Sequence, residues 1–220
     1  MAESAARHVV LMFERISEAI DAAQDRLSEL DGVIGDADHG ITMALGFHSV
    51  CAEFGRPGQH LSTASEVLDK AATTFLEAAG ASTGPLYASA FRRASERLAG
   101  VERLDAAAVT AMLQGIAAGI GERGKAQRGD KTMLDAWLPA AEAGARAVAC
   151  GLEGQAYWQE VIAAGEHGAN ATRSMVAMKG RAARAGQRSL GHIDPGAAST
   201  VIILQAMAEA MAEEVSTNPG

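Results

Sequence analysis

Apolar side chains recur at spacings of three and four residues along most of this 220-residue chain. The first such stripe runs through Val9, Met12, Ile16 and Ile20 and continues to Leu30. This is the period of an amphipathic α-helix, whereas a half-buried strand would alternate apolar and polar side chains. No segment shows convincing strand alternation, a heptad array or an internal repeat. The sequence therefore predicts an all-α fold.

Glycine- and proline-rich links divide this helical pattern into eight segments. Ser62 and Asp105 are suited to cap the third and fifth helices, and Pro139 is expected to kink the sixth helix or to mark its true start. We expect an antiparallel bundle or helical barrel, formed by a single domain over residues 1–215 and followed by a frayed tail at residues 216–220. The apolar stripes of the third and fifth helices cover residues 67–79 and 109–120, and the other helical segments cover residues 9–30, 40–54, 85–100, 133–148, 155–178 and 201–211.

Charge and composition argue against several classes of protein. The 27 acidic residues exceed the 19 basic ones, and the formal net charge of −8 argues against a nucleic-acid binder. No apolar run approaches the roughly 20 residues needed to span a bilayer, and residues 1–14 lack the uninterrupted apolar core of a signal peptide. Cys51 and Cys150 form no Cys-x-x-Cys pair. We therefore expect a cytoplasmic protein with reduced thiols that binds neither nucleic acid nor membranes.

A glycine-punctuated turn after the first helix carries Asp31, Asp36 and Asp38, followed by His39. Carboxylates without thiols suit Mg²⁺ or Ca²⁺ rather than zinc. A helix that begins near Gly40 would direct its free N–H groups and the positive end of its dipole at an anion. Together these features indicate a metal–nucleotide site. The simpler alternative is that the aspartates are solvated turn and capping residues.

Three further links contain more glycine, hydroxyl or basic side chains than a plain connection requires. Residues 80–87 form a small-residue turn whose hydroxyls can bind phosphate, residues 123–133 are basic in an acidic protein, and residues 179–197 combine guanidinium groups with a turn that feeds a helix. Each has a simpler interpretation as a connection or a basic surface, with Thr132 or Asp130 capping the sixth helix. All four motif regions lie between helices, and an antiparallel bundle can gather them at one end.

At these motifs the sequence resembles the L subunit of bacterial dihydroxyacetone kinases, from about residue 11 to residue 211. The resemblance implies an eight-helix up-and-down barrel that binds ADP or ATP with Mg²⁺ at one end. It also implies a phosphotransferase with an alcohol group as acceptor. The matching stretches, in chain order, are Ile34-Gly35-Asp36-Ala37-Asp38-His39-Gly40, Gly84-Pro85-Leu86-Tyr87, Arg123-Gly124-Lys125, Gly129-Asp130-Lys131-Thr132-Met133, Lys179-Gly180-Arg181-Ala182 and Gly191-His192-Ile193-Asp194-Pro195-Gly196-Ala197.

The resemblance also assigns roles to individual residues. Asp31, Asp36 and Asp38 would hold two Mg²⁺ ions that bridge the nucleotide phosphates. Lys179 and His192 match the motifs without an assigned contact. The residues expected to bind the nucleotide are His39, Gly40, Ile41 and Thr42 at the next helix start, Ser82 and Thr83 at the phosphates, and Gly124, Met133, Arg181, Asp194 and Pro195 around the base and sugar, with Gly196 beside them.

The turn at residues 80–84 departs from the family pattern. The family usually has two adjacent glycines before its serine-glycine-proline turn, whereas Ala81 stands here in place of a glycine and Thr83 in place of a serine. Because Thr83 keeps a hydroxyl, phosphate binding is expected to survive. The tightness of nucleotide binding and the choice of nucleotide are left open.

A partner subunit is a further implication of the resemblance. In the family a K subunit holds the ketone through a histidine, and that region is missing from this chain, which is therefore expected to bind nucleotide without a ketose site. Two routes of phosphoryl supply stay open. ATP exchanges as a substrate in the first, and in the second ADP stays bound as a coenzyme and is rephosphorylated by a phosphotransferase-system protein. A chain that holds the L domain alone favours the second route.

Other functions also stay open at this point. A kinase that acts on a tetrulose or another ketose is equally compatible, because acceptor specificity would lie in the missing subunit. A non-enzymatic sensor, loaded with ADP or ATP and bound to a transcription regulator, is a second alternative, although the presence of all three aspartates favours chemistry. A helical lipid or acyl carrier would leave the motif regions unexplained. Homodimer formation is left open.

Overall fold

The structure of the protein is a computed structural model that describes the backbone of residues 4–80 and 82–217, with side chains as far as residue 212. Within these residues the chain forms eight α-helices, two 3₁₀ helices and no strand, which confirms the all-α prediction. The elements are α1 (Ala5–Ile34), α2 (His39–Phe54), α3 (Ala64–Ala78), α4 (Thr83–Arg97), α5 (Ala106–Gly124), α6 (Leu134–Ala149), α7 (Gly154–Ala171), η1 (Thr172–Ser174), η2 (Arg181–Ser189) and α8 (Pro195–Thr217).

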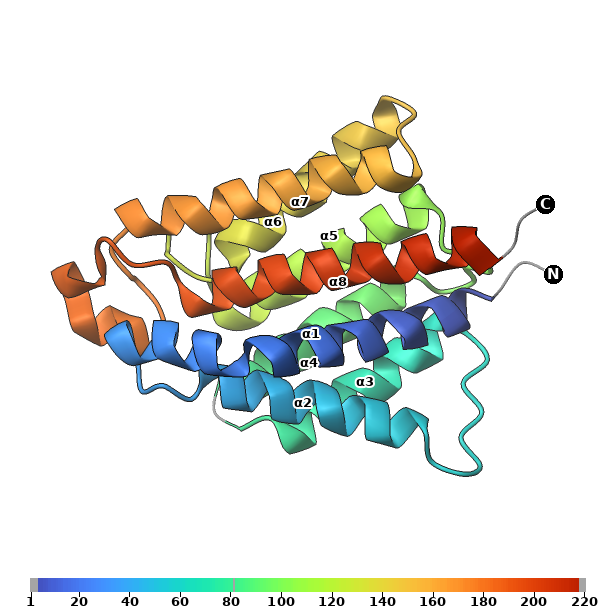
Figure 1. The fold of residues 1–220 in the computed structure, drawn as a ribbon, viewed down its shortest axis with the longest axis horizontal. Coiled ribbons are helices and arrows are strands. Elements are labelled where there is room, and N and C mark those ends of the chain that lie inside the picture. Colours follow the sequence, from blue (N-terminus) through green and yellow to red (C-terminus); the bar gives the residue numbers. More distant parts are fainter. Residues whose placement is uncertain (1–3, 81, 218–220) are drawn as a thin grey trace.

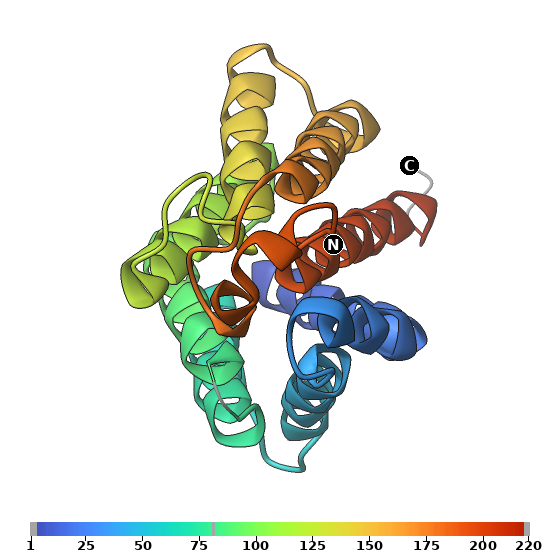
Figure 2. The same cartoon turned by 90° about the vertical axis from the view of Figure 1, so that its left-hand side faces the viewer.

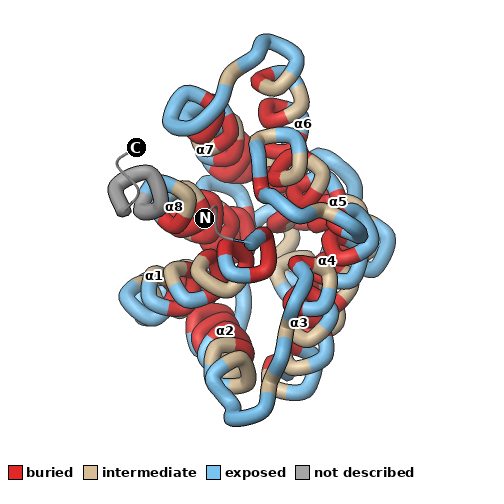
Figure 3. Tube along the Cα trace, turned by 90° about the vertical axis from the view of Figure 1, so that its right-hand side faces the viewer, coloured by how far each residue is buried: buried red, intermediate tan, exposed pale blue. Residues whose placement is uncertain are grey.

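The helices stand side by side along the long axis of the molecule and form a closed ring (Figure 1). Each helix packs against the next one in the chain, and α8 returns to pack against α1. Seen from one end, the helices surround a common interior (Figure 2). The residues that face this interior are the buried ones (Figure 3). The expected antiparallel barrel is therefore confirmed.

Aromatic side chains fill the interior between the first four helices. The rings of Phe47 and Phe75 lie 5.2 Å apart with an interplanar angle of 72°, and Phe47 also meets Phe13, Tyr87 and Phe91. Edge-to-face pairs of this kind add to the free energy gained from burying the rings. The cluster joins α1, α2, α3 and α4 into one core.

The starts of two helices test the capping predictions. Asp105 caps α5 as predicted, because its Oδ1 accepts the N–H of Ala108 at 2.8 Å. Ser62 does not cap α3. Thr63 is the N-cap: its Oγ1 accepts the N–H of Glu66 at 3.1 Å, and the Glu66 carboxylate accepts the N–H of Thr63 at 3.2 Å. This reciprocal pair satisfies two backbone donors and places the start of α3 one residue later than the capping prediction did.

Two further predictions concern the sixth and seventh helices, and the seventh helix is shorter than predicted. α7 ends at Ala171, whereas the apolar period predicted a helix as far as residue 178. The chain leaves the helix at Thr172, which is fully buried and whose carbonyl oxygen accepts a hydrogen bond from the Lys131 ammonium. Pro139 lies inside α6, so the alternative that it marks the helix start is wrong.

α8 reaches Thr217 at the end of the chain, and the last three residues of the expected tail, 218–220, lie outside the described residues. In the described part of the chain, no helix combines the length and the apolar character that crossing a membrane requires.

Candidate active site

The four motif regions meet at one end of the barrel around a cavity of about 350 Å³. They come from the α1–α2, α3–α4 and α5–α6 links and from the segment between α7 and α8, and Figure 2 shows the molecule from this end. Of the residues predicted to bind metal or nucleotide, all except Gly40, Ile41 and Thr42 line the cavity. The lining residues among them are Asp31, Asp36, Asp38, His39, Ser82, Thr83, Gly124, Met133, Arg181, Asp194, Pro195 and Gly196.

Three carboxylates form the acidic part of the cavity. Asp31 lies in the last turn of α1, and Asp36 and Asp38 follow in the turn to α2, where Ala37 between them has a φ of 64°. Each aspartate offers one oxygen within 4.8 Å of the oxygens of the other two. Hard oxygen donors gathered this closely are the donor set that Mg²⁺ and Ca²⁺ prefer.

Asp31 and Asp38 differ in what their carboxylates do for the local fold. Asp31 Oδ2 accepts the N–H of Asp38 at 3.0 Å and the N–H of His39 at 3.4 Å, so it closes the start of α2. Asp38 stands at the N-cap position of α2 but makes no capping bond with its side chain. Burial, and then the charge of Asp31, raise the pKa of the Asp38 carboxyl. The interpretation of Asp38 as a capping residue is therefore not supported, and its Oδ2 instead accepts a hydrogen bond from Arg181.

Arg181 balances part of this negative charge. Its Nη1 donates to Asp36 Oδ2 and, at 2.7 Å, to Asp38 Oδ2. Carboxylates this close together repel one another unless a cation lies between them. The guanidinium of Arg181 takes that position here, at the acidic end of the cavity. Its predicted contact with the base and sugar of a nucleotide stays a prediction.

His39 lies in the cavity wall as the first residue of α2. Its Nε2 is 2.9 Å from Ser199 Oγ, so the side chain joins α2 to α8 beneath the cavity. Burial lowers the pKa of His39 to about 4, although the charge of Asp31 acts in the opposite direction. The imidazole is therefore neutral at physiological pH, and it supplies a hydrogen bond rather than a positive charge.

Three of the predicted nucleotide-binding residues do not line the cavity: Gly40, Ile41 and Thr42. The packing of α2 against α1 requires glycine at position 40, because a Cβ atom there would collide with the carbonyl oxygen of Gln24 in α1. The side chain of Ile41 is 54% exposed to solvent. The predicted contacts of these three residues with a nucleotide stay predictions.

The α3–α4 link brings hydroxyl groups and a helix start to the cavity. Ser82 is the N-cap of α4 without a side-chain capping bond, Thr83 is the first residue of the helix, and both line the cavity. A Cβ atom on Gly84 would collide with the carbonyl oxygen of Ala79, so the turn requires glycine there. The free N–H groups of such a helix start suit a phosphate. Ala81 lies outside the described residues, whereas Thr83 keeps its hydroxyl at the cavity.

Asp135 organises the α5–α6 link, although the sequence pattern did not single it out. Its Oδ1 accepts the N–H of Gly129 at 2.6 Å, and its Oδ2 accepts the N–H of Thr132 at 2.9 Å. Thr132 Oγ1 accepts the N–H of Leu134, the first residue of α6, at 3.2 Å, but the N-cap of α6 is Met133, so Thr132 is not the capping residue. The Asp130 carboxylate accepts a hydrogen bond within the link and does not cap the helix. This network fixes the link that places Met133 at the cavity.

Lys131 and Asp194 are a buried cation and a buried carboxyl on the cavity wall. Lys131 is 1% exposed, and its Nζ donates to the carbonyl oxygens of Thr172 and His192 at 2.5 Å each. Asp194 Oδ2 accepts the N–H of Ala197 at 2.8 Å, and burial raises the pKa of Asp194 to about 7. Burial lowers the pKa of Lys131, against the charge of Asp194. The sequence motif contained Lys131, but its two carbonyl partners lie far along the chain and left no local signal.

Comparison with known proteins places these features in a family. The model of the DAK2 domain family matches residues 33–209, well over half of the chain. This chain belongs to the DAK2 domain family. A relative from Escherichia coli (strain K12), "PEP-dependent dihydroxyacetone kinase, ADP-binding subunit DhaL", is 33% identical over 205 residues, which cover 93% of this chain and 97% of the relative. The expected kinship with the nucleotide-binding subunits of dihydroxyacetone kinases, a family of phosphotransferases, is thus confirmed.

Longer kinases contain the same DAK2 unit. "D-erythrulose kinase" from Mycolicibacterium smegmatis (strain ATCC 700084 / mc(2)155) is 30% identical over 204 residues, which cover 93% of this chain and 35% of that protein. The solved structure of the dihydroxyacetone kinase from C. freundii in complex with AMP-PNP and Mg²⁺ matches 95% of this chain and 34% of its own, with a TM-score of 0.71 and 24% identity. The DAK2 chain thus spans about a third of these two proteins, and the structural match shows the fold.

Proposed function

We propose that this protein is the nucleotide-binding subunit of a dihydroxyacetone-type kinase. In this role it would present a phosphoryl group, carried on a Mg²⁺-bound nucleotide, to a small ketose that is bound by a separate K subunit. Both subunits would be cytoplasmic. The observation that carries the proposal is the presence of three convergent aspartates and the start of α4 in one cavity. Both features suit a metal-bound phosphate, because carboxylates bind the cation and a helix start binds the anion.

The acidic cluster fits Mg²⁺ in the chemistry of its donors. Asp31, Asp36 and Asp38 offer carboxylate oxygens within 4.8 Å of one another, and no thiol or imidazole belongs to the cluster. We propose that the cluster holds two Mg²⁺ ions. When bound, Mg²⁺ neutralises the charge on a phosphoryl group in transfer. Asp31 contributes a second function, because its hydrogen bonds to the start of α2 hold the turn that carries the other two ligands.

The remaining cavity residues would position the nucleotide. Phosphoryl transfer needs alignment and fixed positive potential more than a side-chain base. Ser82 and Thr83 at the start of α4 would meet the phosphates, and Arg181 would add its charge at the same end. The residues proposed for the base and sugar are Gly124, Met133, Asp194, Pro195 and Gly196.

The proposed partner follows from what the cavity contains. His39 is the one histidine among the described cavity residues, and it is buried, neutral and hydrogen-bonded to Ser199. A histidine in that state does not suit capture of a ketone, so the ketose would be held by the K subunit. The name of the E. coli relative, PEP-dependent and ADP-binding, supports the route in which ADP stays bound and a phosphotransferase-system protein rephosphorylates it.

A second acceptor is favoured by one relative. The D-erythrulose kinase of M. smegmatis contains the same unit, so a tetrulose is an alternative acceptor for the assembled kinase. A non-enzymatic sensor bound to a transcription regulator is less well supported, because such a protein would not need three convergent carboxylates.

Native mass spectrometry of the purified protein in the presence of Mg²⁺ tests this function. We expect a stoichiometric mass increment that matches ADP with two Mg²⁺ ions. The increment should be absent from Asp36→Ala, which removes one carboxylate of the cluster. Asp69→Ala is the matched control, because Asp69 is an exposed aspartate of α3 away from the cavity.

Titration with ATP and Mg²⁺ distinguishes the two supply routes. Protein purified without ADP that binds ATP reversibly would support an exchanging kinase. The proposed function is wrong if neither nucleotide binds to the wild-type protein at millimolar concentration.

A further inference from the structure

The segment between α7 and α8 crosses the cavity end of the barrel (Figure 2). Residues 173–191, which we call the strap, include most of η1 and all of η2, and the strap carries Lys179 and Arg181 in the cavity lining. Gly180 and Gly186 have φ values of 63° and 55°, in the left-handed region that favours glycine. A ligand in the cavity would lie beneath this segment, so the position of the strap affects how fast that ligand leaves.

Hydrogen bonds join the two ends of the strap. The N–H of Gly191 donates to the carbonyl oxygen of Arg173 at 2.7 Å. The ammonium of Lys131 donates to the carbonyl oxygens of Thr172 and His192, the residues just outside each end. We call Thr172, Arg173, Gly191 and His192 the neck, which lies where the strap joins the barrel. The buried Lys131 of the α5–α6 link spans it.

Beyond the neck the strap has few anchors. The N–H of Met178 donates to the carbonyl oxygen of Asp130 at 3.0 Å, whereas the hydrogen bond from the N–H of Ala177 to Ser189 Oγ, at 3.0 Å, lies within the strap itself. At the tip, Arg181 contacts the acidic cluster. Most strap side chains are exposed or half-buried. Segments with so little buried apolar surface open readily, so the position of the strap depends on the neck, on the contact of η2 with α1 and on the tip.

The burial of Lys131 needs an explanation, because burying an ammonium is unfavourable unless it is well hydrogen-bonded. Its two acceptors are main-chain carbonyls from the two ends of the strap, at 2.5 Å each. The ammonium therefore serves as a cross-link between distant parts of the chain. A methionine of similar length would keep the packing of the stem and leave both carbonyls without this donor.

We propose that Lys131 is a positioning residue whose ammonium fastens the neck of the strap. It thereby holds Arg181 against the acidic cluster and slows the loss of a bound nucleotide. The part that concerns nucleotide rests on the function proposed above, whereas the fastening of the strap does not depend on it.

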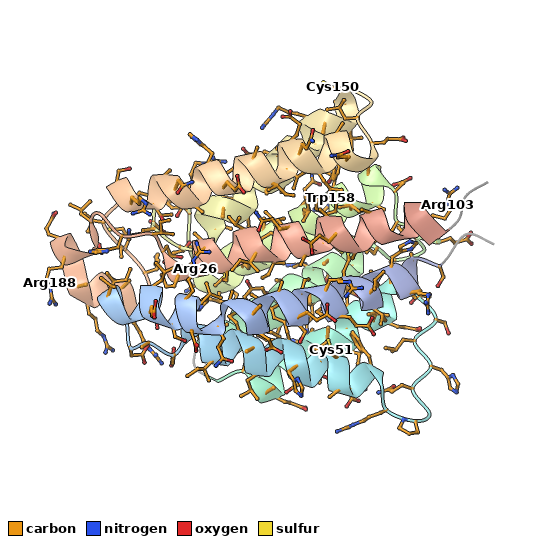
Figure 4. All side chains as sticks on the ribbon, viewed as in Figure 1. Arg26, Cys51, Arg103, Cys150, Trp158 and Arg188 are labelled. Atoms are coloured by element: carbon orange, nitrogen blue, oxygen red, sulfur yellow. The ribbon has the colours of Figure 1, made fainter. Side chains whose placement is uncertain are left out.

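Limited trypsin digestion of the full-length, nucleotide-free protein, read by mass spectrometry, tests the neck. Arg103 is an internal reference, because it lies at the opposite end of the barrel from Arg188 (Figure 4). Lys131→Met is expected to raise strap cleavage, relative to cleavage after Arg103, by about tenfold or more. A general loosening of the fold would raise cleavage in the strap and cleavage after Arg103 together. The strap sites beyond the neck follow Lys179, Arg181, Arg184 and Arg188.

Lys125→Met is the matched control for this variant. Lys125 and Lys131 lie in the same link and both have positive φ values, 48° and 60°, but Lys125 is exposed. The two substitutions therefore remove the same charge at similar backbone angles, and we expect Lys125→Met to change strap cleavage by less than about twofold. Lys131→Arg should restore most of the protection, because a guanidinium can still donate to two carbonyls.

Two outcomes of the digestion would overturn the proposal. One is equal strap cleavage in Lys131→Met and Lys125→Met. The other is a Lys131→Met protein that has lost its helices by circular dichroism, because Lys131 would then support the whole core rather than the strap.

The rate of ADP dissociation in the presence of Mg²⁺ tests the second part of the proposal, that Lys131 slows the loss of a bound nucleotide. We expect dissociation about tenfold faster from Lys131→Met than from the wild type, and an unchanged rate with an opened strap would refute the claim on nucleotide retention. A wild-type protein that binds no ADP would defeat the proposed function, and the digestion would still decide whether Lys131 fastens the strap.

Discussion

Two thiols in this chain have contrasting surroundings. Cys51 in α2 is half-buried and its Sγ donates to the carbonyl oxygen of Phe13 at 3.4 Å, whereas Cys150 at the end of α6 is exposed (Figure 4). Burial is the largest of the effects that raise the pKa of Cys51 to about 11. Because the thiolate is the reactive form, we expect iodoacetamide near pH 8 to modify Cys51 about 100-fold more slowly than Cys150.

Peptide mass spectrometry over a time course measures both rates in one sample. Raising the pH toward 11 should increase the rate at Cys51, because its thiolate fraction grows until the pH passes its pKa. In urea the two cysteines are expected to react alike, which controls for the reagent. Similar rates in the native protein would mean that α2 opens before the reagent attacks, and would contradict the packing described for Cys51.

The start of α3 separates a capping side chain from its neighbour. Thr63 supplies the Oγ1 that caps the helix, whereas Ser62 supplies only its backbone N–H, which is 2.7 Å from Glu66 Oε2. Thr63→Ala is expected to lower the free energy of unfolding by about 1 kcal/mol, which lowers Tm by roughly 2–4 °C for a chain of this size. Ser62→Ala keeps the backbone bond, and its effect should stay below about 0.5 kcal/mol.

Urea denaturation of the two variants beside the wild type measures both effects. If Ser62→Ala lowered the free energy of unfolding as much as Thr63→Ala does, the assignment of Thr63 as the cap would be contradicted. An unchanged Thr63→Ala protein would mean that packing alone sets where α3 begins.

The helices themselves could be predicted because their apolar period is local in sequence. Their ends could not always be predicted, because some depend on distant partners. Asp105 caps α5 through a residue three positions along the chain, and it was predicted. α7 ends where the Thr172 carbonyl meets Lys131, a residue of another link, and that contact has no trace in the periodicity of α7. Local signals thus identify an element, and tertiary contacts decide its length.

For the site, the motifs identified most of the residues that the barrel brings together. The three aspartates, the hydroxyls of the α3–α4 link and Arg181 were singled out by residue type, and all line one cavity. At Gly40 the structure adds a requirement for glycine that the motif did not indicate, close packing against α1, and its predicted contact with a nucleotide stays a prediction. Lys131 and Asp135 stayed without a role because hydrogen bonds to main-chain groups define what they do.

Binding of a ligand at this cavity should stabilise the whole barrel. The cavity residues span positions 31 to 196 of the chain, so unfolding scatters them and abolishes a site for the nucleotide. Mg²⁺ alone depends mainly on three aspartates within eight residues of each other. It retains some affinity for the unfolded chain, which reduces its effect on stability.

We therefore expect Mg²⁺ alone to raise Tm only slightly and ADP with Mg²⁺ to raise it much more. At 100 times the dissociation constant the gain is about 2.7 kcal/mol, or roughly 5–11 °C in Tm, and EDTA should remove it. Differential scanning fluorimetry measures the shift, with Asp69→Ala as the control that keeps it and Asp36→Ala as the variant that loses it. An equal shift for both variants would show that the nucleotide binds without the acidic cluster, and the metal site would then need to be sought elsewhere in the barrel.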